Sequence, residues 1–593
     1  MQLVRKTVKG YSYWYLVQKG RKDGVVTNIK TIYLGTADRL AAMLSESGEA
    51  QFPASFDSWE VGASAALCSE LRELDVLRII DEACPARRAD ATLSYGQLLA
   101  VIALQRAIAP RPLRSLEHLR QWYEGCGVRE LLPMDPAGLD ARRVHEALAS
   151  LHAADLERLE TDLVAAVVRK YQVSRDVLAF DTSNFDSYTQ SANPSRLLKR
   201  GHAKSKRTNL RVLGLGMLVT ADDDGLPLLW FVYPGNHPDV RSFRSFLSRL
   251  KRRQRQLGVD TRSTVVCDGG NICKATVERI DADPTLHLVA RLPTGHAPEA
   301  DQLRTDELLP VAGGFGNAVR AKLLKTTVYG KARTVVAVYS ASMHASQVPG
   351  LKRDIRKANG DLQALVERLE RQAAGKARGK PLTISGVRTR ADKLLERQYM
   401  ADLFQLDIGG TDARPTLGFR FDNDAWERLE AYRLGRTAVI TDHDDWTVER
   451  IVSSLREQSH VEFVFRQLKD PQWASAVPLR HYTDSLLRVH AALSVLALLL
   501  AKLVVRRLKR AGIQTTVSEA LHELSELRLA QLHYGPSAPP ALKELARARR
   551  LPPKPSGLQA RMIRALGISE ALQLGPTTRR RSSRKTAEIP ATA

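Results

Sequence analysis

Two short stretches decide the fold: residues 177–181 read Val-Leu-Ala-Phe-Asp, and residues 264–268 read Thr-Val-Val-Cys-Asp. In each stretch, four residues typical of a buried strand run directly into an aspartate. A carboxylate at the end of a buried strand is held on a rigid element, with its oxygens facing a cleft. Asp181 and Asp268 are therefore the first candidates for a functional site, although an aspartate after a strand is also a common turn or cap residue.

The chain around these stretches predicts an α/β layer. Apolar runs over residues 210–220 and 226–233 predict two more strands, and residues 240–257 have helical spacing. A helix over 272–280 and a strand over 286–292 follow. Three strands, a helix, a strand, a helix and a strand is the element order of an RNase H-like fold, which we expect here.

A third acidic candidate, Glu462, lies in a segment with helical spacing. In a helix over residues 447–469, four polar side chains share one face, at spacings of four, four and three residues: Gln458, Glu462, Arg466 and Lys469. A face that combines a carboxylate with cations suits a divalent metal and a phosphate, because magnesium prefers carboxylate and phosphate oxygens. The alternative is an ordinary exposed pair of opposite charges one helical turn apart.

Composition limits the class of partner. The 593 residues carry 89 Lys and Arg against 65 Asp and Glu, a formal net charge of +24, which favours nucleic acid before an anionic membrane surface. The five cysteines form no Cys-x-x-Cys pair, so no zinc site is predicted. No apolar signal segment opens the sequence, and the apolar run 489–501 is too short to span a bilayer. We therefore expect an intracellular protein that does not enter a membrane.

Taken together, these segments resemble the DDE transposases of bacterial insertion sequences, in particular the IS-four group. Residues 177–185 are similar to the first-aspartate strand of that family, and residues 265–271, Val-Val-Cys-Asp-Gly-Gly-Asn, are similar to the second. Residues 461–469, Val-Glu-Phe-Val-Phe-Arg-Gln-Leu-Lys, resemble the glutamate helix. The resemblance covers about residues 177–500, and the 193 residues from 269 to 461 fit the family's β-rich insertion.

The resemblance implies roles by position. Asp181, Asp268 and Glu462 would be the catalytic triad and would bind two Mg²⁺ ions, with Mn²⁺ as an alternative. Lys469 matches the lysine of the group's tyrosine–arginine–glutamate–lysine signature, which would touch the DNA backbone. Leu455 and Gln458 stand where the signature has tyrosine and arginine, so the signature is half present.

Several cations and one aromatic residue are candidates for contact with DNA. The side chains expected to bind DNA are Lys204, Lys206, Arg207, Gln458, Arg466 and Lys469. The first three belong to a basic cluster for which a solvated loop is the alternative. Two basic helix faces, 251–255 and 506–510, either line a DNA channel or are merely exposed. Trp426 either stacks on an extruded base or packs in a core.

Changes of pattern along the chain predict six regions. They are an N-terminal β-hairpin region (1–62), a helical region (63–170), the first part of the RNase H-like core (171–295), a β-rich insertion (296–435), the second part of the core with the glutamate helix (436–510), and a C-terminal helical region with a basic tail (511–593). The helical region is assigned to DNA binding by elimination and family analogy, since it has no recognisable helix-turn-helix signature.

We therefore expect a DNA transposase that binds transposon ends, cuts phosphodiester bonds and joins the 3′-hydroxyl to target DNA by two-metal-ion catalysis. It would act as a homodimer on paired ends, in the bacterial cytoplasm at the nucleoid. Two alternatives stay open. One is a catalytically silent DNA-binding regulator derived from a transposase, and the other is a metal-dependent nuclease without strand transfer.

Overall fold

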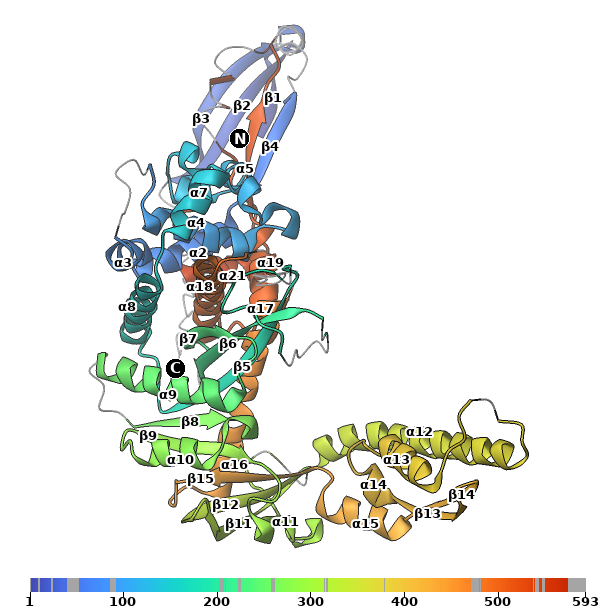
Figure 1. Ribbon diagram of the computed structural model, residues 1–593. Helices are drawn as coiled ribbons and strands as arrows, with labels where there is room; N and C mark the ends of the chain where they lie inside the picture. Colours follow the sequence, from blue (N-terminus) through green and yellow to red (C-terminus); the bar gives the residue numbers. More distant parts are fainter. Residues whose placement is uncertain are drawn as a thin grey trace, which may run out of the picture. The chain divides into compact units, whose positions relative to one another are not determined.

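The computed structural model describes most of the chain (Figure 1). The described residues are 2–8, 11–22, 25–39, 53–85, 92–190, 192–201, 207, 209–221, 225–256, 262–313, 315, 318–377, 379–470, 479, 481–536, 538, 543, 544, 546 and 550–573. They form two compact units, of which the smaller comprises Met1–Ala65, Gly125–Gly127 and His522–Ala593, and the larger comprises Ala66–Glu124 and Val128–Leu521.

The smaller unit joins segments from the two ends of the sequence. Strands β1 (Gln2–Val8), β2 (Tyr11–Lys22) and β3 (Val25–Thr36) form an antiparallel sheet in that order. Strand β4 (Ser55–Glu60) pairs antiparallel with β16 (Arg528–His533). The N-terminal sheet therefore has three strands, one more than the hairpin that was predicted. The C-terminal region contributes strand β16 as well as helix α21 (Gly557–Leu566).

A nine-stranded mixed sheet forms the centre of the larger unit, with strand order β10-β11-β12-β15-β9-β8-β5-β6-β7. The strands are β5 (Val177–Ser187), β6 (Arg211–Thr220), β7 (Pro227–Pro234), β8 (Ser263–Cys267), β9 (Leu286–Leu292), β10 (Leu309–Pro310), β11 (Val319–Val328), β12 (Lys331–Ser340) and β15 (Arg436–Thr441). Strands β5, β8 and β9 run parallel to one another, and the other neighbouring pairs are antiparallel. The fold is therefore mixed α/β, and residues 177–292 follow the predicted element order.

Two helices interrupt this order as expected, α9 (Asp239–Gln256) after β7 and α10 (Lys274–Asp281) after β8. Helix α9 packs two rings onto the first strand: the ring of Phe180 lies 5.1 Å from that of Phe243 and 4.1 Å from that of Phe246. All three rings are fully buried. Burial of side chains of this size contributes about 2 kcal/mol or more each, so the strand that leads into Asp181 is firmly held.

The segment between β12 and β15 has a core of its own. It comprises helices α12 (Ala341–Ala373), α13 (Ile384–Leu394), α14 (Met400–Leu403) and α15 (Asn423–Tyr432), and a hairpin of β13 (Phe404–Thr411) and β14 (Arg414–Phe421). The expected β-rich insertion over 296–435 is thus mostly helical, because β10, β11 and β12 join the main sheet instead. Trp426 packs against this core, so the ordinary-packing alternative applies to it.

The remaining helices are α2 (Gly62–Glu73), α3 (Val76–Ala83), α4 (Tyr95–Ile108), α5 (Leu119–Glu124), α6 (Val128–Leu131), α7 (Ala141–Ala149), α8 (Ala153–Tyr171), α11 (Pro298–Asp301), α16 (Val448–Glu457), α17 (Ser459–Lys469), α18 (Asp484–Arg510) and α19 (Val517–Ser525). Helix α18 is long and apolar enough to cross a membrane by length and composition alone. Yet 83% of its most apolar window is buried in the protein, as in a core helix.

Helix α18 packs against α4, α7 and α8 and pairs charges with the helical region. Arg507 Nη1 lies 2.8 Å from Oε1 of the buried Glu70, which also accepts a hydrogen bond from Tyr171 Oη. Arg506 is itself buried. The basic face 506–510 is therefore largely internal, and its first two arginines do not line a DNA channel.

Candidate active site

Asp181 and Asp268 lie at the same level on neighbouring parallel strands. In the ladder between β5 and β8, Phe180 pairs with Cys267, so the next residue along each strand is an aspartate. Asp181 is partly buried and Asp268 is exposed. Burial raises the pKa of the Cys267 thiol well above its usual value, and the negative charges of Asp268 and Asp181 act in the same direction. The thiol is therefore neutral.

The next strand adds a cation that sequence reasoning missed. Ala290 of β9 pairs with Cys267, so Arg291 follows beside Asp268. Arg291 Nη1 lies 3.9 Å from Asp268 Oδ1, which also accepts a 2.9 Å hydrogen bond from the backbone N–H of Gly269. Asp268 thus also caps the short 3-10 helix Gly269–Asn271, which is the structural role considered above as the alternative for this residue. A lone arginine inside the apolar run Leu-Val-Ala-Arg-Leu was the sequence signal for Arg291.

A further carboxylate stands at the start of helix α9. Asp239 Oδ1 accepts a 2.8 Å hydrogen bond from Oγ1 of the buried Thr182, the residue after Asp181. Burial, together with the negative charges of Asp239 and Asp181, raises the pKa of Tyr233 to about 12, so the phenol stays protonated. Sequence reasoning missed Asp239, because nothing in the run Asn-His-Pro-Asp reveals its contact with a distant strand.

The two faces of β5 are covered by different helices. Side chains alternate along a strand, so Phe180 and Thr182 share one face, which carries the contacts with α9. Asp181, Ser183 and Phe185 share the other face. Helix α17 packs against β5 and β6 on that second face, since its Lys469 contacts both Ser183 and Phe185. Asp181 therefore faces the side of the sheet that the glutamate helix covers.

Lys469 fixes the end of α17 to this strand. Its Nζ donates a 2.6 Å hydrogen bond to Ser183 Oγ and lies 5.2 Å from the centre of the Phe185 ring. Glu462 and Arg466 are exposed on the same helix. In the part of the chain that the structure describes, no three His, Cys, Asp or Glu side chains are grouped closely enough to hold a metal ion, so Glu462 does not join the two aspartates in one cluster here.

The predicted polar face of residues 447–469 is only partly correct. The predicted single helix is interrupted at Gln458, between α16 and α17, and the Gln458 side chain is buried with 3% of its surface exposed. The two helices pack against different parts of the sheet: α16 buries Ile451 and Val452 in one core, whereas α17, with Phe465 buried, packs against β5 and β6. Gln458 is therefore not on the exposed face of Glu462 and is not placed to contact DNA.

The basic cluster after the first aspartate is described only in part. Arg207 Nη1 donates a 2.8 Å hydrogen bond to Oη of the exposed Tyr188, just beyond β5. Lys204 and Lys206 lie outside the described residues. Arg466 is exposed, with its guanidinium 5.8 Å from the centre of the Phe463 ring. Of the predicted DNA contacts that the structure describes, Lys469 is the one that contacts the strand of Asp181.

Neither a protein-family model nor a curated protein matches the sequence. Among solved structures, the chain is similar to the piggyBac transposase in a cryo-EM structure of its synaptic complex with hairpin DNA. The TM-score is 0.32 at 9% sequence identity, over 88% of this chain and 78% of that chain. A likeness of this size carries no argument about function, so the assignment depends on the residues themselves.

Proposed function

We propose that this chain is a DDE-type DNA transposase that cuts DNA at transposon ends and joins the 3′-hydroxyl to target DNA. The observation that carries the proposal is the pairing of Phe180 with Cys267, which puts Asp181 and Asp268 side by side on parallel strands. The resemblance of residues 177–500 to insertion-sequence transposases supports it. The strand order β7-β6-β5-β8-β9, with β6 antiparallel to both neighbours, supports an RNase H-like core.

The donor chemistry of this edge fits Mg²⁺. Asp181 and Asp268 offer hard carboxylate oxygens, and 52% of the Asp268 side chain is exposed. Protein sites for Mg²⁺ commonly use one or two carboxylates, with water and substrate phosphate as the other ligands. We propose this pair as the primary ligands and Glu462, from the helix over the same face, as the third carboxylate when DNA is present. When bound, the metal supplies Lewis-acid polarisation of the phosphodiester and neutralises its developing charge.

The neighbouring side chains have roles that follow from their contacts. Lys469 holds the end of the glutamate helix on β5 and presents a positive charge to a phosphate near Asp181. Arg291 offsets the negative charge of Asp268 and attracts DNA to the edge. Asp239 holds Thr182 and, through it, the backbone next to Asp181. These residues orient DNA and carboxylates, and the pre-organisation lowers the barrier to in-line attack.

The test uses conservative variants of the two aspartates. Asp181→Asn and Asp268→Asn should bind DNA from the ends of the element, identified as inverted repeats in the DNA that flanks the gene, but should not cut it in magnesium. Asp186→Asn is the matched control, because Asp186 lies on the same strand and faces the opposite side from Asp181. Undiminished cleavage by Asp181→Asn would overturn the assignment.

A second assay separates the alternatives. End DNA that already carries a free 3′-hydroxyl should be joined to a target plasmid by the wild-type protein. Cutting without joining would favour the nuclease, and binding without either reaction would favour the silent regulator.

A further inference from the structure

We propose that the outer face of helix α9 is a second DNA-binding surface, which holds the sugar-phosphate backbone of a duplex. The proposed function supplies the identity of the ligand, and the helix itself supplies the observations. No role has been given above to this face, which includes the predicted basic segment 251–255.

Beyond the exposed Asp239 at its start, α9 exposes a row of side chains along one side. They are Arg241, Arg244, Ser245, Ser248, Lys251, Arg252 and Arg255. These residues form what we call the α9 stripe, in which all but the two serines are cations. The opposite side of the helix is apolar and buried on the sheet through Phe243 and Phe246. At 1.5 Å per residue the stripe is about 21 Å long, roughly the length of six base pairs of duplex DNA.

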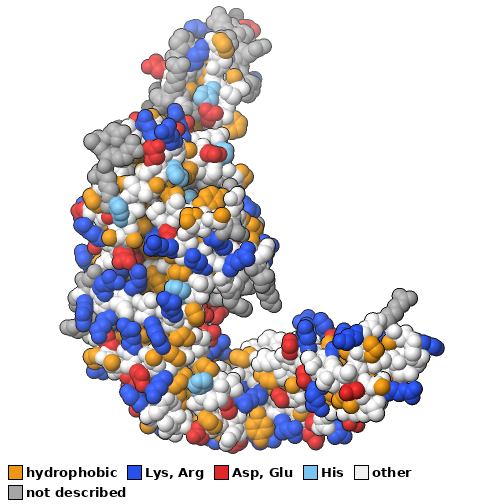
Figure 2. Space-filling view, viewed as in Figure 1, with side chains coloured by type: hydrophobic (Ala, Val, Ile, Leu, Met, Phe, Trp, Pro, Cys, Tyr) orange, Lys and Arg blue, Asp and Glu red, His pale blue; other side chains and the backbone are white. Residues whose placement is uncertain are grey.

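Lys and Arg side chains gather over this part of the protein surface in Figure 2. A solvated helix face usually mixes both signs of charge, since alternating charges stabilise an exposed helix. The α9 stripe has no acidic member, and the acidic residue of the helix, Asp239, is its first residue. The observed bias therefore indicates a polyanionic partner rather than a merely soluble surface.

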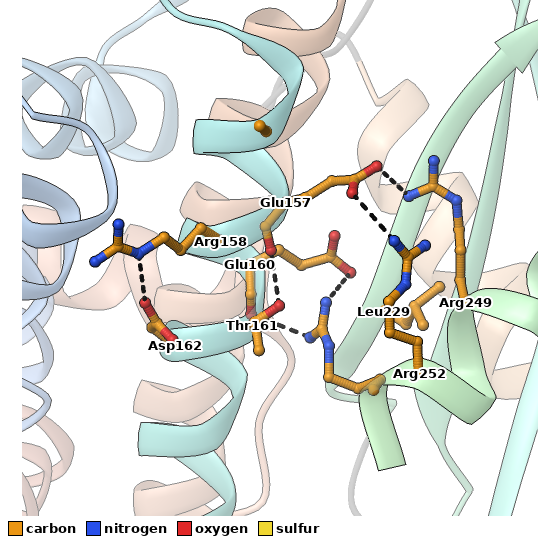
Figure 3. A pocket seen from close by; sticks show the side chains of 10 residues that line it. Glu157, Arg158, Glu160, Thr161, Asp162, Leu229, Arg249 and Arg252 are labelled. Carbon is orange, nitrogen blue, oxygen red and sulfur yellow. Dashed lines mark hydrogen bonds and ion pairs between the residues drawn. The ribbon is translucent and has the colours of Figure 1, made fainter. Parts of the chain in front are cut away.

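Two other arginines of α9, Arg249 and Arg253, face helix α8 and have a structural role. Arg249 Nη1 lies 2.8 Å from Glu157 Oε1, and Nη2 of the buried Arg253 lies 3.3 Å from Glu160 Oε1, both on α8 (Figure 3). Glu160 also accepts a 2.9 Å hydrogen bond from the backbone N–H of Trp230. These ion pairs attach α9 to α8, so both arginines already have a carboxylate partner.

The stripe is not balanced in this way. Lys251 Nζ lies 2.9 Å from Asp283 Oδ2, and Arg252 Nη1 lies 3.9 Å from Glu157 Oε2. Among the described residues, no carboxylate is paired with Arg241, Arg244 or Arg255. Three guanidinium groups without a carboxylate partner among the described residues thus remain in one row, and guanidinium suits phosphate because its planar fork can donate two hydrogen bonds.

Helix α10 widens the surface. Arg279 Nη2 donates a 2.8 Å hydrogen bond to Ser248 Oγ, which holds this guanidinium against the middle of the stripe. A hollow of about 580 Å³ lies between the two helices. Its charged lining residues are Lys251, Arg252, Arg255, Arg279 and Asp283. Because four cations and one carboxylate line this hollow, its charge favours the binding of phosphate groups.

One end of the stripe lies beside the strand of the first aspartate. Asp239, the first residue of α9, is bonded to Thr182 beside Asp181, and Arg244 Nη2 donates to Sγ of Cys273, five residues beyond Asp268. A backbone bound along α9 therefore reaches the end of the helix where Asp239 contacts Thr182, on the face of β5 opposite to the one that carries Asp181. This path makes duplex DNA, rather than a membrane surface, the partner that we assign to the stripe.

The test measures binding separately from cleavage. The full-length double variant Arg244→Glu/Arg255→Glu is titrated with a duplex of random sequence, in a chelator, over a series of salt concentrations. Affinity should fall at least roughly tenfold, and the salt dependence should weaken by about two ions, because each lost phosphate contact removes about one. The control variant Arg371→Glu/Lys393→Glu makes the same change of charge on α12 and α13. Its affinity for the duplex and the salt dependence of its binding should both stay as in the wild type.

A photo-crosslinking amino acid keeps the proposal falsifiable if the double variant folds poorly. Placed at the exposed Ser245 of α9, it should attach to the duplex, whereas at the exposed Ser346 of α12 it should not. Unchanged affinity and salt dependence, an equal loss in the control, or tighter binding of the stripe to anionic vesicles than to DNA would overturn the proposal. Loss of binding in a protein that never cuts DNA would sustain the stripe and refute the transposase, and the two failures are therefore distinguishable.

Discussion

Lys469 Nζ donates a 2.6 Å hydrogen bond to Ser183 Oγ, and this contact joins the glutamate helix to the strand of the first aspartate. The two residues are 286 positions apart in the sequence. Because Ser183 shares a face of β5 with Asp181, the bond fixes the side from which Glu462 approaches. This lysine and this serine thus act together with the buried apolar residues of α17 to orient the candidate active site.

Lys469→Met and Ser183→Ala should distinguish the effect of the hydrogen bond between these two residues from the effect of the positive charge of Lys469. Ser183→Ala removes the hydrogen bond and keeps the cation, so affinity for end DNA should stay within a few-fold of the wild type. Lys469→Met also removes the positive charge, so affinity should fall roughly tenfold, since a hydrogen bond to a charged group contributes about 1.5–3 kcal/mol. Filter binding of end DNA checks both, and equal losses in the two variants would contradict a role for the charge.

Arg291→Leu should strengthen metal binding. The guanidinium lies 3.9 Å from Asp268 Oδ1, and two unit charges about 4 Å apart interact by about 1 kcal/mol in water and by more near a protein surface. Removal of this competing cation should lower the dissociation constant for Mg²⁺ roughly fivefold. Calorimetric titration with Mg²⁺ measures the change. Arg262→Leu, at the other end of β8, is the control and should leave the constant unaltered.

Asp239→Ala should destabilise the fold by about 1–2 kcal/mol, because Thr182 is buried and loses the acceptor of its hydroxyl proton. Asp239→Asn keeps an acceptor and should cost less. Urea denaturation of these variants, of Thr182→Val and of the double variant gives a thermodynamic cycle. Additive effects of Asp239→Ala and Thr182→Val would show that the two side chains are not coupled.

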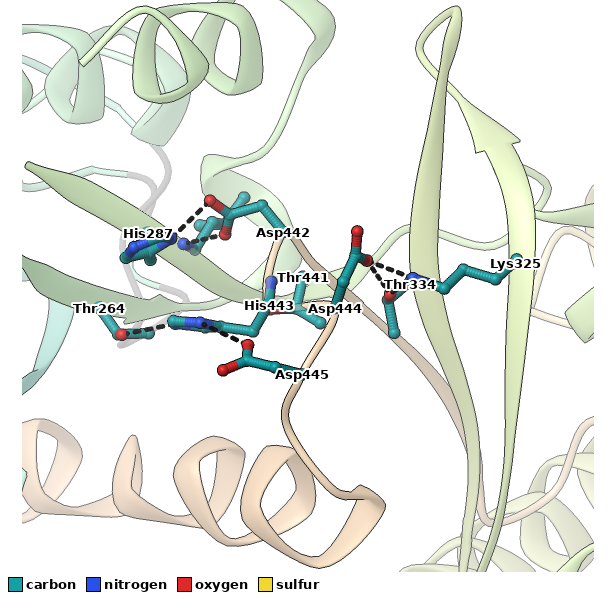
Figure 4. Close-up of polar contacts among 10 residues, drawn as sticks. Thr264, His287, Lys325, Thr334, Thr441, Asp442, His443, Asp444 and Asp445 are labelled. Carbon is teal, nitrogen blue, oxygen red and sulfur yellow. Dashed lines mark hydrogen bonds and ion pairs between the residues drawn. The ribbon is translucent and has the colours of Figure 1, made fainter. Parts of the chain in front are cut away.

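Stability should fall as the pH drops below about 6.5, in part because of His443. Its Nε2 lies 2.8 Å from Thr264 Oγ1 (Figure 4). Its ring also stacks on that of Trp446, with the ring centres 3.7 Å apart. Burial lowers the pKa of His443, and the charge of His287 lowers it further, so the folded state disfavours the proton that the unfolded chain takes up. Stability is therefore fully present above the unfolded pKa and is lost as pH falls through the window below it.

His443→Gln should reduce this pH dependence, because glutamine does not titrate in the window. The measurement is the free energy of unfolding in urea at neutral and at mildly acid pH. A variant as sensitive to acid as the wild type would assign the effect to other groups, such as His481, whose pKa burial lowers to about 4.

Much of the central sheet could be predicted from the sequence, because its strands are buried on both faces and form short apolar runs. The strand predicted over 286–292 is observed as Leu286–Leu292, and the predicted helix 240–257 as Asp239–Gln256. Asp181 and Asp268 were found because each ends such a run. These features are local, so a single stretch of sequence contains them.

Features that depend on pairing between distant segments could not be predicted. Arg291 and Asp239 reach the site through neighbours on other strands, which no spacing along the chain records. The interruption at Gln458 accompanies a change of packing partner, because α16 and α17 pack against different parts of the sheet. Strands β11 and β12 were expected in the insertion, since their apolar pattern does not say which sheet they extend.

The pairing of β4 with β16 sets an order of events during synthesis. Their paired residues are about 470 positions apart, so at roughly 5–20 residues per second β4 waits for its partner for about 25–95 s. Lys469 and Ser183 leave the ribosome before β16 does. The strand edge of β4 thus stays open on the nascent chain after both halves of the carboxylate site have been made, and a chain that stops short of Arg528 keeps that edge exposed to association with other chains.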